Sequence, residues 1–171
     1  AYNGPVALRY PRGSVPAIDW GVPETPIELG KAEVLNDGQD VAIFAIGSMV
    51  ATAFAAVKQL EQEGIHAALI NARFVKPLDR ETVVRFAHRV PRFVLVEENT
   101  MCGGFGSAVL ELLAHEGFTD VQVKHLAVPD EFIEHGSVDI LHRLVGLSAE
   151  HIVEAARALC RASQKTPVLS D

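Results

Sequence analysis

Val41-Ala42-Ile43-Phe44-Ala45-Ile46 is an unbroken apolar run, and a helical pattern of apolar residues follows it from Ser48 to about Glu63. Gly64 ends this pattern, as glycine commonly does just beyond the C-terminal end of a helix. An apolar run without alternation is typical of a strand buried on both faces of a parallel sheet. The stretch therefore predicts a β-strand followed by an α-helix, which is the repeating unit of α/β proteins.

The same unit recurs further along the chain. Apolar runs stand at 67–70 and 93–96, and residues 121–126, in which Val121 and Val123 alternate with Gln122 and Lys124, predict a further strand. Helices are expected after Asp79, after Gly106 and from Ser148 to about Arg161. Strands and helices that alternate in this way form a mostly parallel, doubly wound sheet. The run 32–35, which precedes the turn residues 36–38, predicts an antiparallel edge strand. The predicted fold class is α/β, with three layers around a five-stranded, mostly parallel sheet that has one antiparallel edge strand.

Composition excludes several classes of function. The chain has 171 residues, 49% of them hydrophobic, which suffices for one α/β domain with a short appendage. A net charge of −7 without any basic run argues against a nucleic-acid partner and an anionic membrane. No apolar stretch approaches the roughly 20 residues that span a bilayer. Cys102 and Cys160 are far apart and show no metal-like spacing, so we expect reduced thiols and a cytoplasmic protein.

Glu97-Glu98-Asn99 and the turn Gly103–Ser107 stand between a predicted strand and a predicted helix. Glycines in this position could cradle a phosphate, or they could form a tight turn that lets the helix pack closely on the strand. The spacing differs from a dinucleotide fingerprint, and Val123 occupies the place of the ribose-binding acid. Glu97 and Glu98 could act as an acid/base pair, but adjacent strand residues point to opposite faces. At most one of them is expected in any one pocket.

Histidines and serines give no catalytic or metal-binding signature. No H-x-x-x-H motif or Cys/His cluster occurs among the seven histidines, which are His66, His88, His115, His125, His135, His142 and His151. Neither Ser48 nor Ser107 stands in a G-x-S-x-G motif, and capping of the following helices explains both. We therefore expect no metal site in this chain.

Residues 5–8 are apolar, and Pro11 restrains Tyr10 to an extended conformation. We expect this run to be the last strand of an upstream domain, which places Arg9 and Arg12 at a strand's carboxyl end. Guanidinium groups there suit a phosphate or carboxylate, and the alternative is that both are surface charges. The proline- and glycine-rich residues that follow predict a linker.

Several blocks carry a resemblance to a known family. They are Arg9–Gly13, Gly30–Leu35 with Asp40–Ile43, Asn71–Asp79, Gly103–Ser107, Pro129–Gly136 and Leu144–Ser148. In this order, and over nearly the whole chain, they resemble the C-terminal quarter of the 1-deoxy-D-xylulose-5-phosphate synthase family.

The resemblance implies a homodimeric transketolase-type enzyme with thiamine diphosphate and Mg²⁺ in its full-length form. Pyruvate is decarboxylated there, and the two-carbon unit is added to glyceraldehyde 3-phosphate. Residues 1–13 would end the pyrimidine-binding domain, 14–29 would be the linker, 30–163 the transketolase C-terminal domain and 164–171 a flexible tail. Arg12 matches the arginine that contacts the acceptor phosphate.

By the same resemblance, the catalytic residues and the cofactor-binding residues lie upstream. We thus expect no catalytic or cofactor-binding residue in this chain, no cofactor bound to it alone, and a role in scaffolding and dimer contacts. Two alternatives remain open. One is the C-terminal domain of a transketolase or of a 2-oxo-acid dehydrogenase β-subunit, and the other is a freestanding nucleotide-binding or interaction module.

Overall fold

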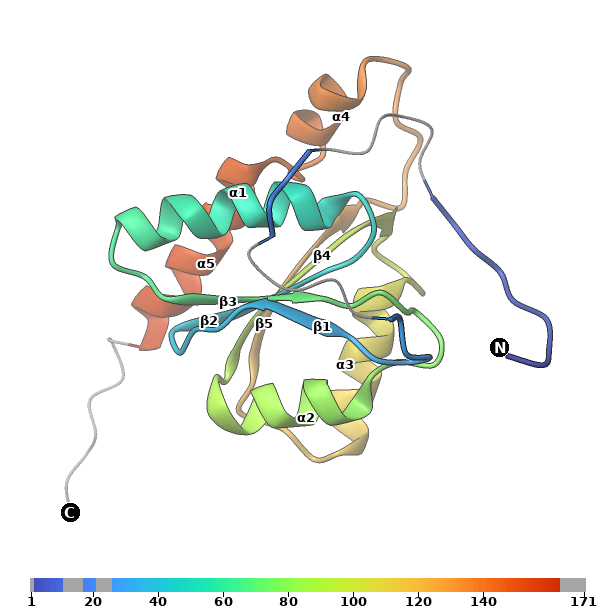
Figure 1. Ribbon diagram of the computed structural model, residues 1–171. Coiled ribbons are helices and arrows are strands. Elements are labelled where there is room, and N and C mark those ends of the chain that lie inside the picture. The colour runs from blue at the N-terminus through green and yellow to red at the C-terminus, as the bar shows by residue number, and fades with distance from the viewer. Residues whose placement is uncertain (1, 11–16, 21–25, 164–171) are drawn as a thin grey trace.

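The computed structural model describes residues 2–10, 17–20 and 26–163. Within them the elements are β1 (Glu33–Asn36), β2 (Val41–Ala45), α1 (Met49–Gln62), β3 (Ala67–Asn71), α2 (Arg80–Arg89), β4 (Arg92–Thr100), α3 (Phe105–His115), β5 (Gln122–Val128), α4 (Val138–Leu144) and α5 (Ala149–Ser163). Helices α1 and α5 cover one face of the sheet, and α2 and α3 cover the other (Figure 1). The three-layer α/β architecture is confirmed.

The strands lie in the order β1-β3-β2-β4-β5. Strands β3, β2, β4 and β5 run parallel to one another, and β1 pairs antiparallel with β3 at the edge, as predicted. The turn after β1 does not form a hairpin with β2, because β3 lies between the two strands. The backbone at Gly38 crosses the start of β3 so closely that a Cβ there would overlap the main chain of 66–68.

The packing of the core explains why the run that forms β2 has no polar residue. Side chains of a strand alternate between faces, and both faces of β2 are covered by helices. Val41, Ile43 and Ala45 pack toward α1 and α5, whereas Ala42 and Phe44 pack toward α2 and α3. All five are buried.

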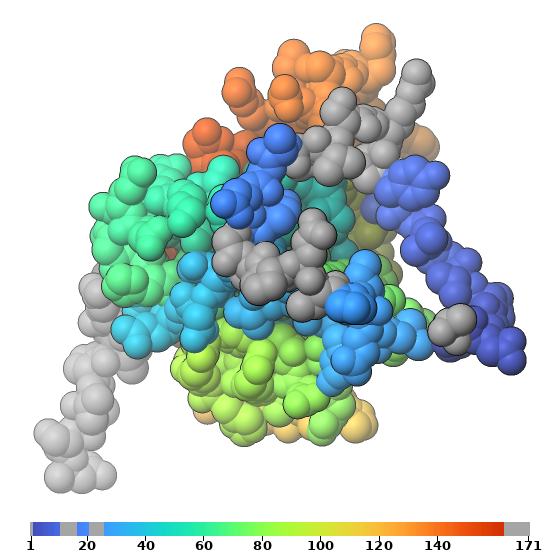
Figure 2. Space-filling view, in the orientation of Figure 1, coloured from blue at the N-terminus to red at the C-terminus, as the bar shows by residue number. Residues whose placement is uncertain are grey.

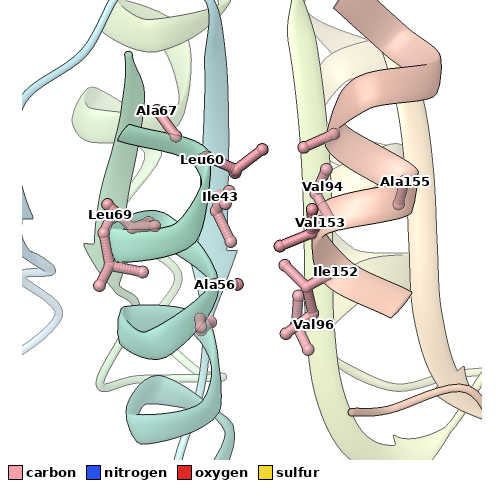
Figure 3. Packing of buried hydrophobic residues seen from close by; sticks show 14 of the residues in the cluster. Ile43, Ala56, Leu60, Ala67, Leu69, Val94, Val96, Ile152, Val153 and Ala155 are labelled. Carbon is pink, nitrogen blue, oxygen red and sulfur yellow. The ribbon is translucent and has the colours of Figure 1, made fainter. Parts of the chain in front are cut away.

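Figure 3 shows the core on the α1/α5 face. On this face, the core contains Ile43 and Leu69 of the sheet with Ala56 and Leu60 of α1, and Val94 and Val96 with Ile152 and Val153 of α5. Helices far apart in sequence thus share one apolar layer over the centre of the sheet.

Asp79 connects the start of the domain to α2. Its carboxylate accepts hydrogen bonds from the Thr82 amide at 3.0 Å and from the Ala32 amide at 2.9 Å. The first is the N-cap of α2 and the second holds the residue before β1. Asp79 thus joins the segment before β1 to the first turn of α2.

Three elements differ from expectation. Strand β4 continues to Thr100 and so includes Glu97 and Glu98, and α3 begins at Phe105 rather than after Gly106. Helix α4 was not predicted. It is only seven residues long, and although Val138, Leu141 and Leu144 recur at helical spacing, none of its residues is buried.

Residues 2–10 form no strand and are exposed, and they project from the body of the molecule (Figure 2). A strand needs a neighbour for its backbone hydrogen bonds, so their assignment to an upstream domain stays a prediction. From the predicted linker, Trp20 packs edge-on against Phe54 of α1, with ring centroids 5.4 Å apart. The predicted tail 164–171 lies outside the described residues.

Candidate functional site

The candidate site lies at the carboxyl ends of β2 and β4. The chain leaves β2 toward β3 on one side and later returns to β4 on the other. In open α/β sheets, the crevice at such a switch point is where ligands usually bind. Ser48 follows β2, and Glu97 and Glu98 lie near the end of β4. We call Ser48, Glu97, Glu98, His125 and His142 the switch-point site.

Glu97 is a fully buried carboxylate at the start of α3. Its oxygens accept hydrogen bonds from the Phe105 and Gly106 amides, each at 2.7 Å, and from the Asn99 side-chain amide at 3.2 Å. The His125 Nε2 atom lies 2.9 Å from its Oε1. The side chain therefore satisfies two backbone donors that the first turn of a helix leaves unpaired, and its charge faces the positive end of the helix dipole.

The glycines of the 103–106 turn make room for this arrangement. A Cβ at Gly104 would overlap the Glu97 carboxylate, and a Cβ at Gly106 would overlap the His125 ring. Of the two interpretations of this turn, close packing is the one that these contacts support. The Phe105 and Gly106 amides, which would have to hold a phosphate, are already bonded to Glu97.

Glu98 points to the opposite face, toward α1 and α4. Its Oε2 accepts a hydrogen bond from the Ser48 hydroxyl, and the His142 Nε2 atom lies 2.9 Å from its Oε1. Its side chain is 25% exposed. Glu97 and Glu98 therefore do not share a pocket, which fits the alternation of strand side chains and rules out a joint acid/base role.

Ser48 occupies the predicted N-cap position of α1, but neither Ser48 nor Ser107 caps its helix through a side-chain hydrogen bond. The Ser48 side chain makes no capping bond to α1, because its hydroxyl donates to Glu98. Ser107 lies within the first turn of α3, where its hydroxyl accepts from the Gly103 amide at 3.0 Å and donates to the Met101 carbonyl at 3.1 Å. The Ser48 hydroxyl thus bonds a residue 50 positions away, and the Ser107 hydroxyl bonds the turn just before its own helix.

Both glutamates are held in the ionised form. Burial raises the pKa of Glu97, but hydrogen bonds from His125, Gly106 and Phe105 outweigh it, so the pKa lies below its ordinary value. Burial likewise raises the pKa of Glu98. The hydrogen bonds from Ser48 and His142, with the charges of His142 and Arg9, lower it further than burial raises it. Both carboxylates are therefore anions at neutral pH.

A carboxyl group whose pKa is lower in the folded state stabilises the fold fully above its ordinary pKa, which for Glu97 is 4.5. This contribution is lost as pH falls through the folded-state pKa. We therefore expect the free energy of unfolding to decline below about pH 4.5, and to decline less steeply in Glu97→Gln. Urea unfolding of both proteins between pH 7 and 3 measures this. Glu111→Gln, an exposed change on α3, is the control, and parallel pH curves for wild type and Glu97→Gln would contradict the prediction.

Among the described residues, no three histidine, cysteine, aspartate or glutamate side chains come together in a way that could hold a metal ion. Both described cysteines are free thiols, Cys102 exposed and Cys160 partly buried. In the described ranges, no helix is long and apolar enough to cross a membrane. Arg12, the predicted phosphate ligand, lies outside the described residues.

Sequence reasoning missed His125 and His142 as partners of the two glutamates. They lie 28 and 44 residues from Glu97 and Glu98, on β5 and α4. No local spacing records such pairs, because the order of the strands brings them together. The one available signal was the position of Glu97 and Glu98 at the end of a strand beside a glycine turn.

The chain belongs to the transketolase C-terminal domain family, whose model matches residues 30–152. It is similar to 1-deoxy-D-xylulose-5-phosphate synthases, being 46% identical over 163 residues to that of Heliobacterium modesticaldum. It is 47% identical over 171 residues to synthase 1 of Geobacter sulfurreducens. These alignments cover 95% and 99% of this chain, but 25% and 27% of the relatives. The chain thus spans about a quarter of their length, and the family resemblance stated from the sequence blocks is confirmed.

Two solved structures share the fold. A split-gene transketolase, described as an inactive beta4 tetramer, superposes with a TM-score of 0.75 at 37% identity. The alignment covers 82% of this chain and 47% of that one. The transketolase from Leishmania mexicana gives a TM-score of 0.55 at 19% identity, over 78% of this chain and 18% of that one. The second match shows likeness of fold alone.

Proposed function

We propose that this chain is the C-terminal part of a 1-deoxy-D-xylulose-5-phosphate synthase, a transferase that depends on thiamine diphosphate and Mg²⁺. The longer enzyme would condense pyruvate with glyceraldehyde 3-phosphate and release CO₂. Its product would supply isoprenoid, thiamine and pyridoxal synthesis. The observation that carries this proposal is 46% identity to such a synthase over 95% of the chain. A cytoplasmic homodimer is part of the same proposal.

The described residues do not fit a site for thiamine diphosphate and Mg²⁺. They contain no group of three side chains able to hold a metal ion. At the switch point, the first amides of α3 are bonded to Glu97, and the other carboxylate, Glu98, stands beside the start of α1. A diphosphate placed there would meet two anions in place of free donors. We therefore assign the cofactor to the rest of the longer protein.

The role proposed for this chain is to support the active site. Its C-terminal domain would pack against the other domains and contribute to the dimer, and Arg12 would bind the acceptor phosphate. A guanidinium group is suited to this because it can bind a phosphate through two parallel hydrogen bonds. The split-gene transketolase offers a parallel, since its related chain is described as inactive in a tetramer of β chains.

Activity of the longer protein tests the proposal. We expect the full-length product of the gene to form 1-deoxy-D-xylulose 5-phosphate from pyruvate and glyceraldehyde 3-phosphate with thiamine diphosphate and Mg²⁺. The 171-residue chain is expected to form none under the same conditions. Mass spectrometry of the product and intact mass of both proteins measure this.

Different outcomes point to the alternatives. Ketol transfer between sugar phosphates without pyruvate would indicate a transketolase, and activity only with a lipoyl acceptor would indicate a 2-oxo-acid dehydrogenase. Turnover by the 171 residues alone would show that the chemistry lies within this chain. Saturable binding of a mononucleotide to the chain would favour a freestanding module.

A further inference from the structure

Helix α4 and the segment before it expose several large apolar side chains. Ile140 and Leu144 stand one turn apart on the same side of the helix and are 63% and 70% exposed. Val138, at the start of the helix, is exposed too, and Phe132, in the segment that leads to it, is fully exposed. We call these four residues the α4 patch. Large apolar side chains that gather on an exposed surface mark a place where another part of a protein binds.

The fold holds α4 in place although the helix buries none of its residues. A helix of seven residues is too short to be stable by itself. The His142 Nε2 atom lies 2.9 Å from Oε1 of Glu98 on β4, and the His142 carbonyl accepts a hydrogen bond from the Leu147 amide at 2.7 Å. His142 is partly buried and lies on the side of the helix opposite Ile140 and Leu144. Contacts on one side therefore fix the helix, and its apolar side stays open.

The chain before β1 reaches the domain at the end of the sheet where α4 lies. Strands β3 and β5 run in the same direction, and α4 follows the carboxyl end of β5. The turn after the carboxyl end of β3 holds the incoming chain, because the Ala32 amide bonds to Asp79 and Gly30 lies against Pro77. A protein part joined to this domain through residues 30–32 is therefore tethered at the carboxyl end of the sheet.

The two ends of the sheet differ in what they expose. At the carboxyl end, Val75 follows β3 and Met101 follows β4, and both are exposed like the α4 patch. At the amino end, ion pairs join Arg89 to Asp37 and Arg157 to Glu63. Of the described residues, no exposed large apolar side chain lies in the turns that enter the strands, which are 37–40, 63–66, 90–91 and 116–121. The carboxyl end is therefore the one suited to an apolar contact.

We propose that the α4 patch is the surface on which the upstream part of the longer synthase, in the same polypeptide, packs against this domain. This inference rests on the proposed function, which supplies the upstream part. The chain covers 25% and 27% of two synthase relatives, so roughly three quarters of their length has no counterpart in it. The tether at residues 30–32 keeps that part close at a high effective concentration, which a second copy of the chain lacks.

Photocrosslinking in the full-length product of the gene tests the proposal. A photoreactive benzophenone amino acid in place of Ile140 is expected to crosslink, within one polypeptide, to peptides that precede residue 1. The same amino acid in place of Glu111, an exposed residue of α3, is the matched control and should give no such crosslink. Crosslinks that join two polypeptides would overturn the proposal in favour of a second copy. A yield no higher than that of the Glu111 control would show that the patch is uncovered.

Hydrogen exchange gives a second readout that does not depend on turnover. The amides of α4 are expected to exchange at least about tenfold more slowly in the full-length protein than in the 171-residue chain, because burial of two apolar side chains stabilises the helix. Ile140→Gln combined with Leu144→Gln should remove most of this difference and leave exchange in the 171-residue chain unchanged. Arg143→Gln, an exposed change on the same helix, is the control and should keep the difference.

Equal exchange of α4 in the two wild-type proteins would overturn the proposal. The proposed function fails separately. If the full-length protein shows the expected crosslinks and slow exchange but forms no 1-deoxy-D-xylulose 5-phosphate, the assignment of the reaction is wrong and the docking surface stands.

Discussion

Replacing Glu97 with alanine is expected to lower the free energy of unfolding by about 3–5 kcal/mol, as when one partner of a buried charged pair is removed. The Phe105 and Gly106 amides and the His125 ring would lose their shared acceptor in a place that water does not reach. Each buried donor left unpaired costs about 1–3 kcal/mol. Since whole domains are stable by only about 5–15 kcal/mol, this is a large loss. Urea unfolding of the 171-residue chain, followed by circular dichroism, measures it.

Two variants sharpen this test. Glu97→Gln keeps one acceptor oxygen but turns an amide group toward the remaining donors, so an intermediate loss is expected. Glu111→Ala removes an exposed carboxylate from the same helix and should change stability by less than about 0.5 kcal/mol. If Glu97→Ala unfolded at the same urea concentration as Glu111→Ala, the carboxylate could not be what holds the start of α3.

Replacing Arg12 with alanine in the full-length enzyme is expected to raise the KM for glyceraldehyde 3-phosphate roughly 30-fold or more, with a much smaller effect on the KM for pyruvate. Removing one partner of a close charged pair costs about 2–5 kcal/mol, and every 1.4 kcal/mol is tenfold. Steady-state kinetics with each substrate varied in turn measure the split between the two KM values.

Arg12→Lys keeps the charge but loses the paired hydrogen bonds of the guanidinium group, so its acceptor KM should lie between those of wild type and Arg12→Ala. Arg85→Ala, which removes an exposed arginine from α2, serves as the control and should leave both KM values unchanged. An unchanged acceptor KM in Arg12→Ala would remove Arg12 from the substrate site, while the family assignment would stand on its own alignment.

The α/β class and its strands were predictable because apolar runs and helix-ending glycines are local patterns in the sequence. A run such as Val41–Ile46 has no polar residue since helices cover both of its faces, and Gly64 marks the end of the helix that follows it. The antiparallel edge strand was also foreseen. Its pairing with β3 was not predicted, because the strand next to it in the sheet is not the strand next to it in the sequence.

The candidate site could be foreseen only in part. Alternation along a strand was enough to separate Glu97 from Glu98, and the glycine turn indicated a close approach of helix and strand. The Glu97 carboxylate packs against Gly104 and the His125 ring packs against Gly106. No spacing in the sequence predicted either contact. Helix α4, which brings His142 to Glu98, was missed because its apolar pattern extends over only seven residues.

By itself, then, the amino-acid sequence determined the succession of the strands and of the longer helices, the opposite directions of Glu97 and Glu98, and the family to which the chain belongs. Only the tertiary structure decided what each carboxylate does. The strand order places β5 beside β4, so that His125 and the first amides of α3 meet Glu97, while Ser48 and His142 meet Glu98. The physical reason is that apolar periodicity is a local property of the chain, whereas the partners of a buried charge come from wherever the fold brings donors together.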